Sequence, residues 1–271
     1  MLLTYRPAAP IASYVEQFWY CEDYQVPHRR ERVLPNGRFQ LILNLSDHFV
    51  SEANACPPGQ SQSSPSALIV GMQSRYTVID TASLQSIIGV LFWPGAARAF
   101  FHPPADEFHN QNIPLDLVWG TAAGELRERL REEATPARKF AVLEATLQAR
   151  VEQRAGLHAA VRYAIGEIQR EPHIRSVLKL TRDAGLSRRR FAQVFREQVG
   201  VTPKLYCRLH RFRQVVRQIS FGAPVDWADV ALAGGYCDQA HLAHEFREFA
   251  GISPGTYVAA DRPFLNHVAM V

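Results

Sequence analysis

A short helical design occurs twice in roughly the last hundred residues, and it constrains the fold more than any other feature of the sequence. In the first copy, residues 184–186 form a tight turn, and Ser187 suits the N-cap of the helix that follows. In the second copy, residues 234–235 form the turn and Asp238 is the N-cap. Two short helices joined by a glycine-containing turn define the helix-turn-helix motif, whose second helix enters the major groove of DNA. One such turn is weak support, but two at similar internal spacing strongly favour a DNA-binding domain.

The spacing predicts an all-α domain over residues 155–260 that contains both units. The first unit is expected at about 175–199 and the second at about 225–250. Thr202 followed by Pro203 is typical of a helix start, so a linker helix is expected at about 203–219. The apolar residues that hold each pair of helices recur at matching places, namely Val177, Leu180, Leu186, Phe191, Val194 and Phe195 in the first unit and Val230, Ala231, Tyr236, Leu242 and Phe246 in the second.

Charge is distributed unevenly over this domain. Residues 170–217 hold thirteen lysines and arginines against three carboxylates, whereas residues 218–260 hold one arginine against five. A basic helical block suits a surface that binds DNA phosphates, because neutralising them releases counterions. A solvated charged face is the alternative, and charge alone does not decide between the two.

The same segment resembles the DNA-binding domain of AraC/XylS-type regulators. That resemblance implies two subdomains, bridged by the helix from Pro203, that read adjacent major-groove segments on one side of the duplex. The matching stretches are A-G-L-S at 184–187, G-V-T-P-K-L-Y at 200–206, V-A-L-A-G-G-Y at 230–236, D-Q-A-H-L at 238–242, E-F-R at 245–247 and G-I-S-P-G-T-Y at 251–257.

The helix that begins after Ser187 carries the principal candidate DNA contacts. Arg189 and Gln193 lie one turn apart on its polar side, at positions where the resemblance implies base contacts. Arginine suits bidentate contact with guanine, and glutamine suits adenine. The other arginines of this helix are expected to contact phosphates, which position the protein without reading sequence; they are Arg188, Arg190 and Arg196.

The second unit offers Gln239, His241 and His244 as groove-facing residues. Gln239 could read a base, and His244 could approach a phosphate. Its local acidity leads us to expect that the first unit supplies most of the affinity and the second modulates sequence choice. The two histidines lack a third ligand at a motif spacing, so a surface pair is favoured over a metal site and no metal is expected.

The first part of the chain, residues 1–154, is expected to be an antiparallel β barrel or sandwich. Short β-branched and aromatic runs, punctuated by turn residues, occupy 40–45, 67–70, 76–79 and 86–93. Residues 114–154 then change to a helical pattern that is split near Pro136. These two helices could cover the sheet or form a dimer interface, and the sequence leaves both open. The predicted fold class is therefore α+β, with the β-rich domain first.

Three stretches resemble an uncharacterised domain that precedes many such DNA-binding modules: V-L-P-N-G at 33–37, L-I-L-N-L at 41–45 and F-W-P-G-A-A at 92–97. The resemblance implies a sensory or oligomerisation role and a cupin-like fold. Barrel mouths commonly hold small molecules against aromatic walls. The candidate lining residues, for which core packing is the alternative, are Trp19, Tyr20, Phe39, Phe92 and Trp93.

These observations predict a cytoplasmic, DNA-binding transcription regulator, expected to be an activator and a homodimer, that is not an enzyme and needs no cofactor. No apolar run is long enough for a membrane span, and the four cysteines fit no C-x-x-C pattern. Double-stranded DNA, a small-molecule effector and RNA polymerase are the expected partners. Two alternatives remain: an N-terminal domain that only dimerises, and an enzyme or alkyl-transfer domain fused to a DNA-binding module.

Overall fold

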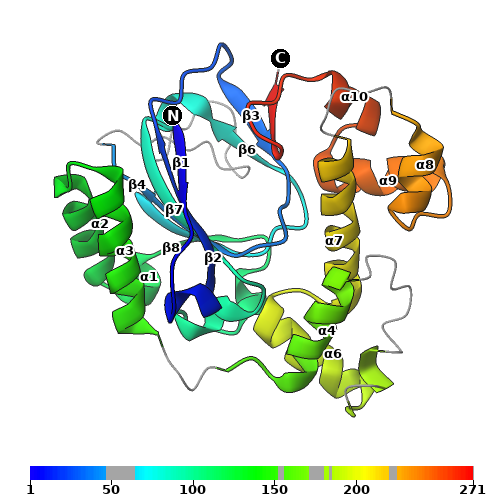
Figure 1. Cartoon of the computed structure of the whole chain (residues 1–271), viewed down its shortest axis with the longest axis horizontal. Helices are drawn as coiled ribbons and strands as arrows, with labels where there is room; N and C mark the ends of the chain where they lie inside the picture. Colours follow the sequence, from blue (N-terminus) through cyan, green and yellow to red (C-terminus); the bar gives the residue numbers. More distant parts are fainter. Residues whose placement is uncertain (47–64, 152–155, 171–179, 183–184, 220–224, 271) are drawn as a thin grey trace.

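A computed structural model describes residues 1–46, 65–151, 156–170, 180–182, 185–219 and 225–270. A domain of β-strands comes first, and a domain of helices packs beside it (Figure 1). Within the described residues, no helix is both long enough and apolar enough to cross a membrane. An antiparallel sheet domain, followed by helices and then an all-α domain, confirms the α+β prediction.

Six antiparallel strands form the larger sheet. One face of this sheet is buried along its four central strands because their alternate residues are apolar, as in Leu41, Leu43 and Ile69. The strands, in the order of the sheet, are β1 (Leu2–Tyr5), β2 (Val15–Glu22), β7 (Ser86–Phe92), β4 (Gln40–Asn44), β5 (Ala67–Val70) and β8 (Asn112–Pro114).

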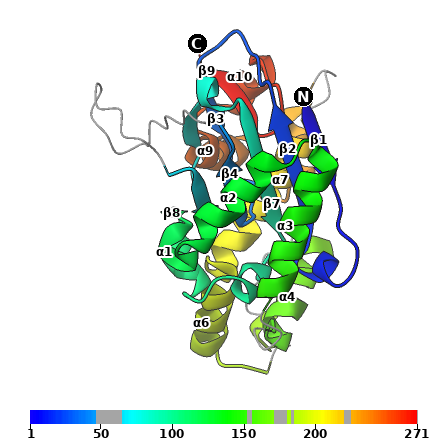
Figure 2. The same ribbon diagram turned by 90° about the vertical axis from the view of Figure 1, so that its left-hand side faces the viewer.

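Helices α2 (Ala122–Glu132) and α3 (Pro136–Arg150) cover that buried face (Figure 2). A four-residue helix, α1 (Asp116–Trp119), precedes them. The break between α2 and α3 falls at Pro136, as predicted, and Thr135 caps the second helix by accepting a hydrogen bond from the Arg138 backbone. The apolar stripes of both helices are buried, and Phe140 packs against Phe18 of β2. Within one chain, the apolar stripes of α2 and α3 therefore cover the sheet.

A smaller sheet of three strands joins the two ends of the chain. β3 (Arg30–Val33) pairs with β6 (Thr77–Asp80) on one side and with β9 (His267–Met270) on the other. Both pairings are antiparallel and extend over four residues. The sequence reasoning did not anticipate β9, which returns from the helical domain to the sheet domain.

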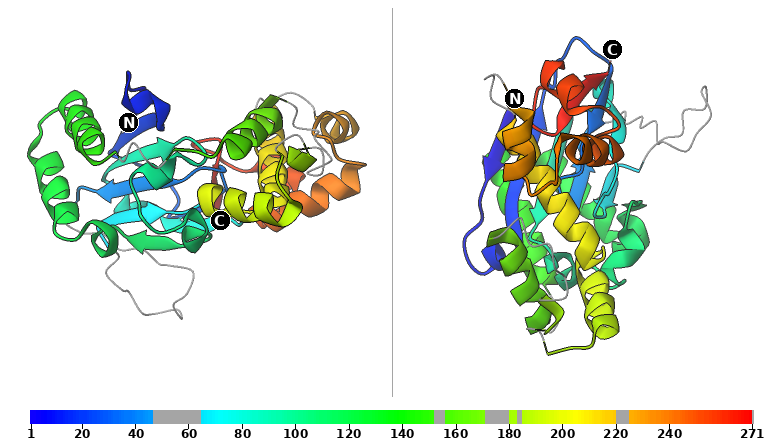
Figure 3. Two further views of the ribbon diagram at one scale, coloured as in Figure 1. Left: turned by 90° about the horizontal axis from the view of Figure 1, so that it is seen from below. Right: turned by 90° about the vertical axis from the view of Figure 1, so that its right-hand side faces the viewer.

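The helical domain is built around α7 (Pro203–Gln218), which runs between two groups of shorter helices (Figures 1 and 3). At about 1.5 Å per residue, its 16 residues make a spacer roughly 24 Å long. The first helix of the first unit lies outside the described residues apart from 180–182. The other helices are α4 (Ala159–Arg170), α6 (Arg188–Val199), α8 (Trp227–Ala233), α9 (Gln239–Ala250) and α10 (Pro254–Ala259).

The helical domain packs against the sheet domain at several places, two of which involve the backbone directly. Near the start of α7, Gly200 adopts a φ of +96°, and its Cα lies against Phe39 and the backbone of Ala105. A side chain there would both strain the backbone and meet Phe39. In the last turn of α9, the carbonyl of Phe249 accepts a 2.8 Å hydrogen bond from the amide of Tyr76. The two domains therefore share one continuous apolar core.

Candidate functional site

Helix α6 presents a cationic face opposite its buried face. Ser187 accepts a hydrogen bond from the Arg190 backbone and so fixes the start of the helix. Phe191 and Phe195 point inward and are fully buried. Because an α-helix repeats every 3.6 residues, this places the other side in solvent. The exposed side chains on it are Arg188, Arg189, Arg190, Gln193 and Arg196.

Arg196 is a member of the predicted set that contacts the sheet domain. Its Nε lies 2.9 Å from an Oδ of Asp106, which belongs to the short 3-10 helix η4 (Ala105–Phe108), and the side chain stays 54% exposed. Gln193 donates a 2.8 Å hydrogen bond to Glu197 on the next turn. In this arrangement, two of the candidate DNA contacts already have protein partners, whereas Arg188, Arg189 and Arg190 project into solvent.

Helix α9 repeats this design with less charge. Asp238 caps it by accepting a 2.7 Å hydrogen bond from the His241 backbone, while Leu242 and Phe246 are buried. Gln239 and His244 are exposed, as the sequence predicted. His241 is different, because it is half-buried and its ring packs edge-on against Tyr236. Its Nδ1 also accepts a 3.4 Å hydrogen bond from the backbone of Cys237, so it stabilises the turn of its own unit.

Several charges that looked opposed in the sequence neutralise one another inside the helical domain. Glu245 of α9 is buried and pairs with Arg208 and Arg211 of α7, at 2.6 and 3.4 Å. Arg208 also pairs with Glu248. Two arginines of residues 170–217 thus bind acidic side chains of residues 218–260. The positive charge counted for the first segment and the negative charge counted for the second are therefore both larger than the charge that each segment exposes to solvent. Arg188, Arg189 and Arg190 of α6, by contrast, stay exposed to solvent.

A second candidate site is the face of the larger sheet that looks away from α2 and α3. Pairing aligns Trp19, Gly89 and Ile42 in one row across three strands. Gly89 has no side chain, and the Trp19 indole fills the space that a Cβ would occupy. Around this row the face is only half-buried, and its mixed apolar and amide lining is Gln17, Trp19, Gln40, Ile42, Leu68, Val70 and Leu91. The next row on the same face is buried and consists of Cys21, Ile87 and Asn44.

The five aromatic residues predicted to line a pocket divide between different environments. Tyr20, Phe39 and Phe92 are buried in the core, where Phe92 packs against Phe100 and Phe101. Trp19 lies on the half-buried face. Trp93 is 37% exposed, and the Arg38 guanidinium lies over its ring. Aromatic character alone could not separate them, because adjacent strand residues such as Trp19 and Tyr20 point to opposite faces. Alternation along β4 and β5 was the signal that could have found Ile42 and Leu68.

Within the described residues, no group of three histidine, cysteine, aspartate or glutamate side chains could hold a metal ion. Cys21 and Cys207 are buried free thiols, and burial raises the pKa of both. A raised pKa disfavours the thiolate, which is the nucleophilic form. Neither thiol therefore has the setting of a reactive cysteine.

Comparisons with known proteins cover both parts of the chain. Residues 180–260 match a family described as "Helix-turn-helix domain", and residues 3–114 match one described as "Domain of unknown function (DUF6597)". No curated protein matches the chain.

Similar solved structures come from several proteins. The DNA-binding domain of AdpA, a global transcriptional factor in complex with a target DNA, is 26% identical; the match covers 37% of this chain and 90% of that chain, with a TM-score of 0.35. ToxT from Vibrio cholerae is 10% identical, with 95% and 98% covered and a TM-score of 0.49. The xylose-binding transcription activator XylR is 18% identical, with 56% and 40% covered and a TM-score of 0.33.

Proposed function

We propose, on the premise that this chain is a non-enzymatic DNA-binding transcription regulator of the AraC type, that α6 supplies its main contacts to the major groove. The observation that carries the proposal is the exposed cationic edge of α6, with Arg188, Arg189 and Arg190 in solvent opposite a buried apolar face. Arg189 and Gln193 read bases, and the neighbouring arginines bind phosphates. For Gln193 and Arg196, this requires leaving Glu197 and Asp106.

Helix α9 is proposed to enter the adjacent groove segment with Gln239 and His244. Support comes from the matched construction of the two units and from the rigid spacer α7 between them. His241, packed on Tyr236, is the weakest of the proposed contacts because it has to rotate before it can reach DNA. The second unit therefore modulates sequence choice, and the first unit supplies most of the affinity.

Selection of bound DNA from a random pool, with the full chain, tests this function. The expected result is one enriched motif with two half-sites in adjacent groove segments. The logarithm of the affinity should fall linearly with the logarithm of the salt concentration, because phosphate contacts release counterions. Recovery of no motif, together with salt-independent binding, would contradict the proposal.

The N-terminal domain is proposed to bind a small-molecule effector on the half-buried face that contains Trp19 and Ile42. This half-buried face carries apolar and amide groups that a small ligand could contact, whereas the opposite face is already closely packed against α2 and α3. A screen of metabolites by thermal shift tests this, since a ligand that binds the folded state raises the melting temperature. A hit should lose its effect in Ile42→Asp, whereas absence of any hit would favour a domain that only dimerises.

Four features of the sequence prediction are carried into this proposal. They are the division into residues 1–154 and 155–260, a homodimer, a cytoplasmic location and RNA polymerase as a partner for activation. Residues 267–270 are added to the first of these units as its last strand, because β9 pairs with β3.

A further inference from the structure

Strand β1 has one edge that pairs with no other strand. It is the outermost strand of the larger sheet, bound only to β2, and Figure 3 shows it in dark blue at the rim of the molecule. Both backbone polar groups of Met1 hydrogen-bond to Glu22 of β2. Because such pairs alternate along antiparallel strands, Leu2 and Thr4 point their N–H and C=O groups away from β2. Among the described residues, these outward groups have no hydrogen-bond partner.

The side chains along this edge are apolar and exposed. Met1, Leu2 and Tyr5 are 72%, 41% and 38% exposed, and they are three of the eight large apolar side chains exposed in the described parts of the chain. No residue of β1 is charged. At the other edge of the sheet, β8 contains Pro114, which lacks an N–H and so opposes pairing. Of the two edges, β1 is therefore the one that suits another strand.

Helix α3 lies over the same edge. The ring of Phe140 lies 5.6 Å from that of Tyr5 in β1 and 6.3 Å from that of Phe18 in β2, measured between centroids. The Tyr5 hydroxyl also donates a 3.1 Å hydrogen bond to Glu144. α3 thus sits above β1 and β2 together, so a strand added at the edge would bring its own covering helix beside α3.

The side of α3 next to these contacts is exposed, small and uncharged. Helical periodicity places Ala137, Ala141 and Gln148 there, and all three are exposed. Small side chains let two helices approach closely. Their exposure leaves room for a second helix beside α3.

We propose that β1 pairs antiparallel with β1 of a second copy of this chain, so that the two large sheets join into one. This inference rests on the homodimer of the proposed function and assigns its interface. Around a centre at Leu3, Leu2 of each copy exchanges backbone hydrogen bonds with Thr4 of the other. The edge is complementary to itself, because each outward N–H meets an outward C=O and no like charges face each other.

The spacing of strands and helices fits this pairing. Neighbouring strands lie about 4.8 Å apart, so two copies joined at β1 would place their α3 helices roughly 10 Å apart. Packed helices are usually about 8–10 Å apart, and the closer distances need small residues at the contact. Ala137 of one copy and Ala141 of the other meet this need. Four residues of strand make too small an interface alone, so the helix contact is an essential part of the dimer.

The pairing also places the DNA-binding domains together. Two identical strands that pair antiparallel are related by a two-fold axis perpendicular to the sheet. In each copy, α2 and α3 lie on one side of the larger sheet and the helical domain lies on the other (Figures 1 and 3). Both helical domains therefore lie on the same side of the joined sheet, as binding to one duplex requires.

Sedimentation equilibrium with the full chain tests the strand contact, and the parent is expected to be a dimer at micromolar concentration. Thr4→Pro should raise the dissociation constant of the dimer about tenfold or more, because each copy loses an N–H that points at its partner. That N–H makes no bond within the chain, and proline is tolerated at such edges, so the fold should be kept. Thr4→Val keeps the N–H and should dimerise like the parent.

A variant of α3 tests the helix contact. Ala141→Arg places two long, like-charged side chains where the helices meet, and should also raise the dissociation constant about tenfold or more. Ala228→Arg adds the same charge at an exposed position of α8 and should leave the dimer intact. Circular dichroism checks that every variant is folded. A monomeric parent, or a dimer that neither Thr4→Pro nor Ala141→Arg weakens, would overturn the proposal.

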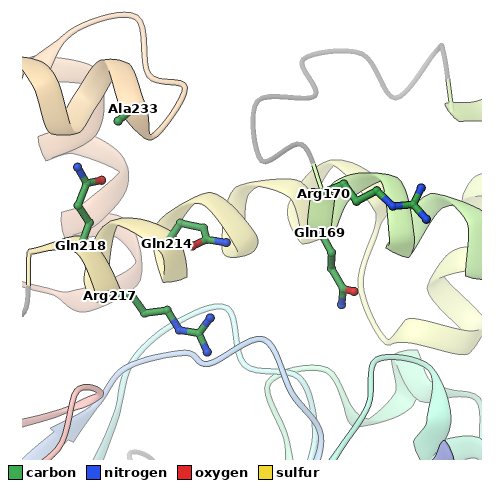
Figure 4. A pocket seen from close by; sticks show the side chains of 6 residues that line it. All are labelled: Gln169, Arg170, Gln214, Arg217, Gln218 and Ala233. Carbon is green, nitrogen blue, oxygen red and sulfur yellow. The ribbon is translucent and has the colours of Figure 1, made fainter.

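Cross-linking tests the register. In a chain with Cys56→Ser and Cys237→Ser, Leu3→Cys should form a covalent dimer on oxidation with diamide, because the two thiols face each other across the two-fold axis. The control is Gln218→Cys. Gln218 is exposed in a pocket that α4, α7 and α8 of the helical domain line (Figure 4), and its thiol should stay reduced. Equal cross-linking of the two variants would contradict the register.

DNA binding separates this inference from the proposed function. On DNA with two neighbouring copies of the selected site, the parent should bind about tenfold or more tightly than on one copy, since the dimer engages both. Thr4→Pro should bind one copy like the parent and lose this gain. A monomeric parent that binds the selected site normally rejects the interface alone. A dimer with the expected variant effects that binds no DNA supports the interface and rejects the proposed function.

Discussion

Nδ1 of His267 lies 2.7 Å from the carboxylate of Glu31, across the pairing of β9 with β3 and 236 positions away in sequence. Glu31 is completely buried. The Tyr24 hydroxyl donates a 2.5 Å hydrogen bond to it, and Nε2 of His28 lies 2.6 Å from the same oxygen. Burial acts to raise the pKa of Glu31, but the hydrogen bonds from His267, Tyr24 and His28 outweigh burial and lower it. An ionised carboxylate therefore joins the last strand to the first domain.

Glu31→Gln is expected to lower the free energy of unfolding by about 2–4 kcal/mol at pH 7, since a buried charge network loses its centre. Because the pKa of Glu31 is lower in the folded protein than its ordinary value of 4.5, the ionised carboxylate contributes fully to the free energy of unfolding above pH 4.5. That contribution is lost as the pH falls through the pKa of Glu31 in the folded protein. The difference between parent and variant should therefore shrink below about pH 4. Urea unfolding against pH measures it, with the exposed Glu128→Gln as control; a constant difference would contradict this account.

Arg189→Ala should weaken binding to the selected DNA site by about ten- to a hundredfold and relax base preference at one position, because a bidentate base contact is worth about 1–3 kcal/mol. His244→Ala should weaken binding about threefold or less, as a peripheral contact does. Titrations by fluorescence anisotropy compare the two, with Arg129→Ala as an exposed arginine outside the helical domain. Equal losses would reject the view that the first unit dominates.

Asp106→Asn should tighten DNA binding by about two- to fivefold, because Arg196 no longer has to leave an ion pair worth about 0.2–1 kcal/mol. The effect should vanish when Arg196 is also changed to alanine. Glu107→Gln, at the exposed neighbouring position of η4, is the matched control for charge. If both single variants tighten binding equally, general charge accounts for the effect and the contact with Arg196 does not.

His210 should make the protein sensitive to acid between about pH 6.5 and 4. The groups that face it are Arg38, Arg213, Arg217 and the Gln214 amide. Since its folded pKa of about 4 lies below the ordinary 6.5, the unfolded chain binds the proton first, and stability falls as the pH drops through this window. His210→Gln should remove up to about 3 kcal/mol of that loss. Parallel curves of stability against pH for the two proteins would contradict the prediction.

Local spacing was enough to predict α6, α7 and α9, because capping residues and apolar repeats act within a few residues. Ser187, Asp238 and Pro203 each begin a helix where the sequence placed it. The linker helix ends at Gln218, one residue earlier than expected. The split at Pro136 followed from the same local rules.

Contacts between distant segments could not be predicted in this way. β9 is four residues long, and its partner β3 reads Arg-Glu-Arg-Val, which lacks the apolar character of a buried strand. Its register depends on Glu31 and His267 meeting in three dimensions. Likewise, Arg208 pairs with Glu245 only because α7 packs against α9. A count of charge along the chain therefore overestimated the net charge that residues 170–217 and residues 218–260 expose to solvent.

The short β9 strand attaches the far end of the helical domain to the sheet domain, while the covalent connection from α3 to α4 attaches the near end. Between these two attachments, Phe39 also packs against Gly200 and Glu16 lies near Arg213. Any reorientation of the helices on DNA should therefore separate these contacts together with Asp106 and Arg196, while residues 267–270 stay in register.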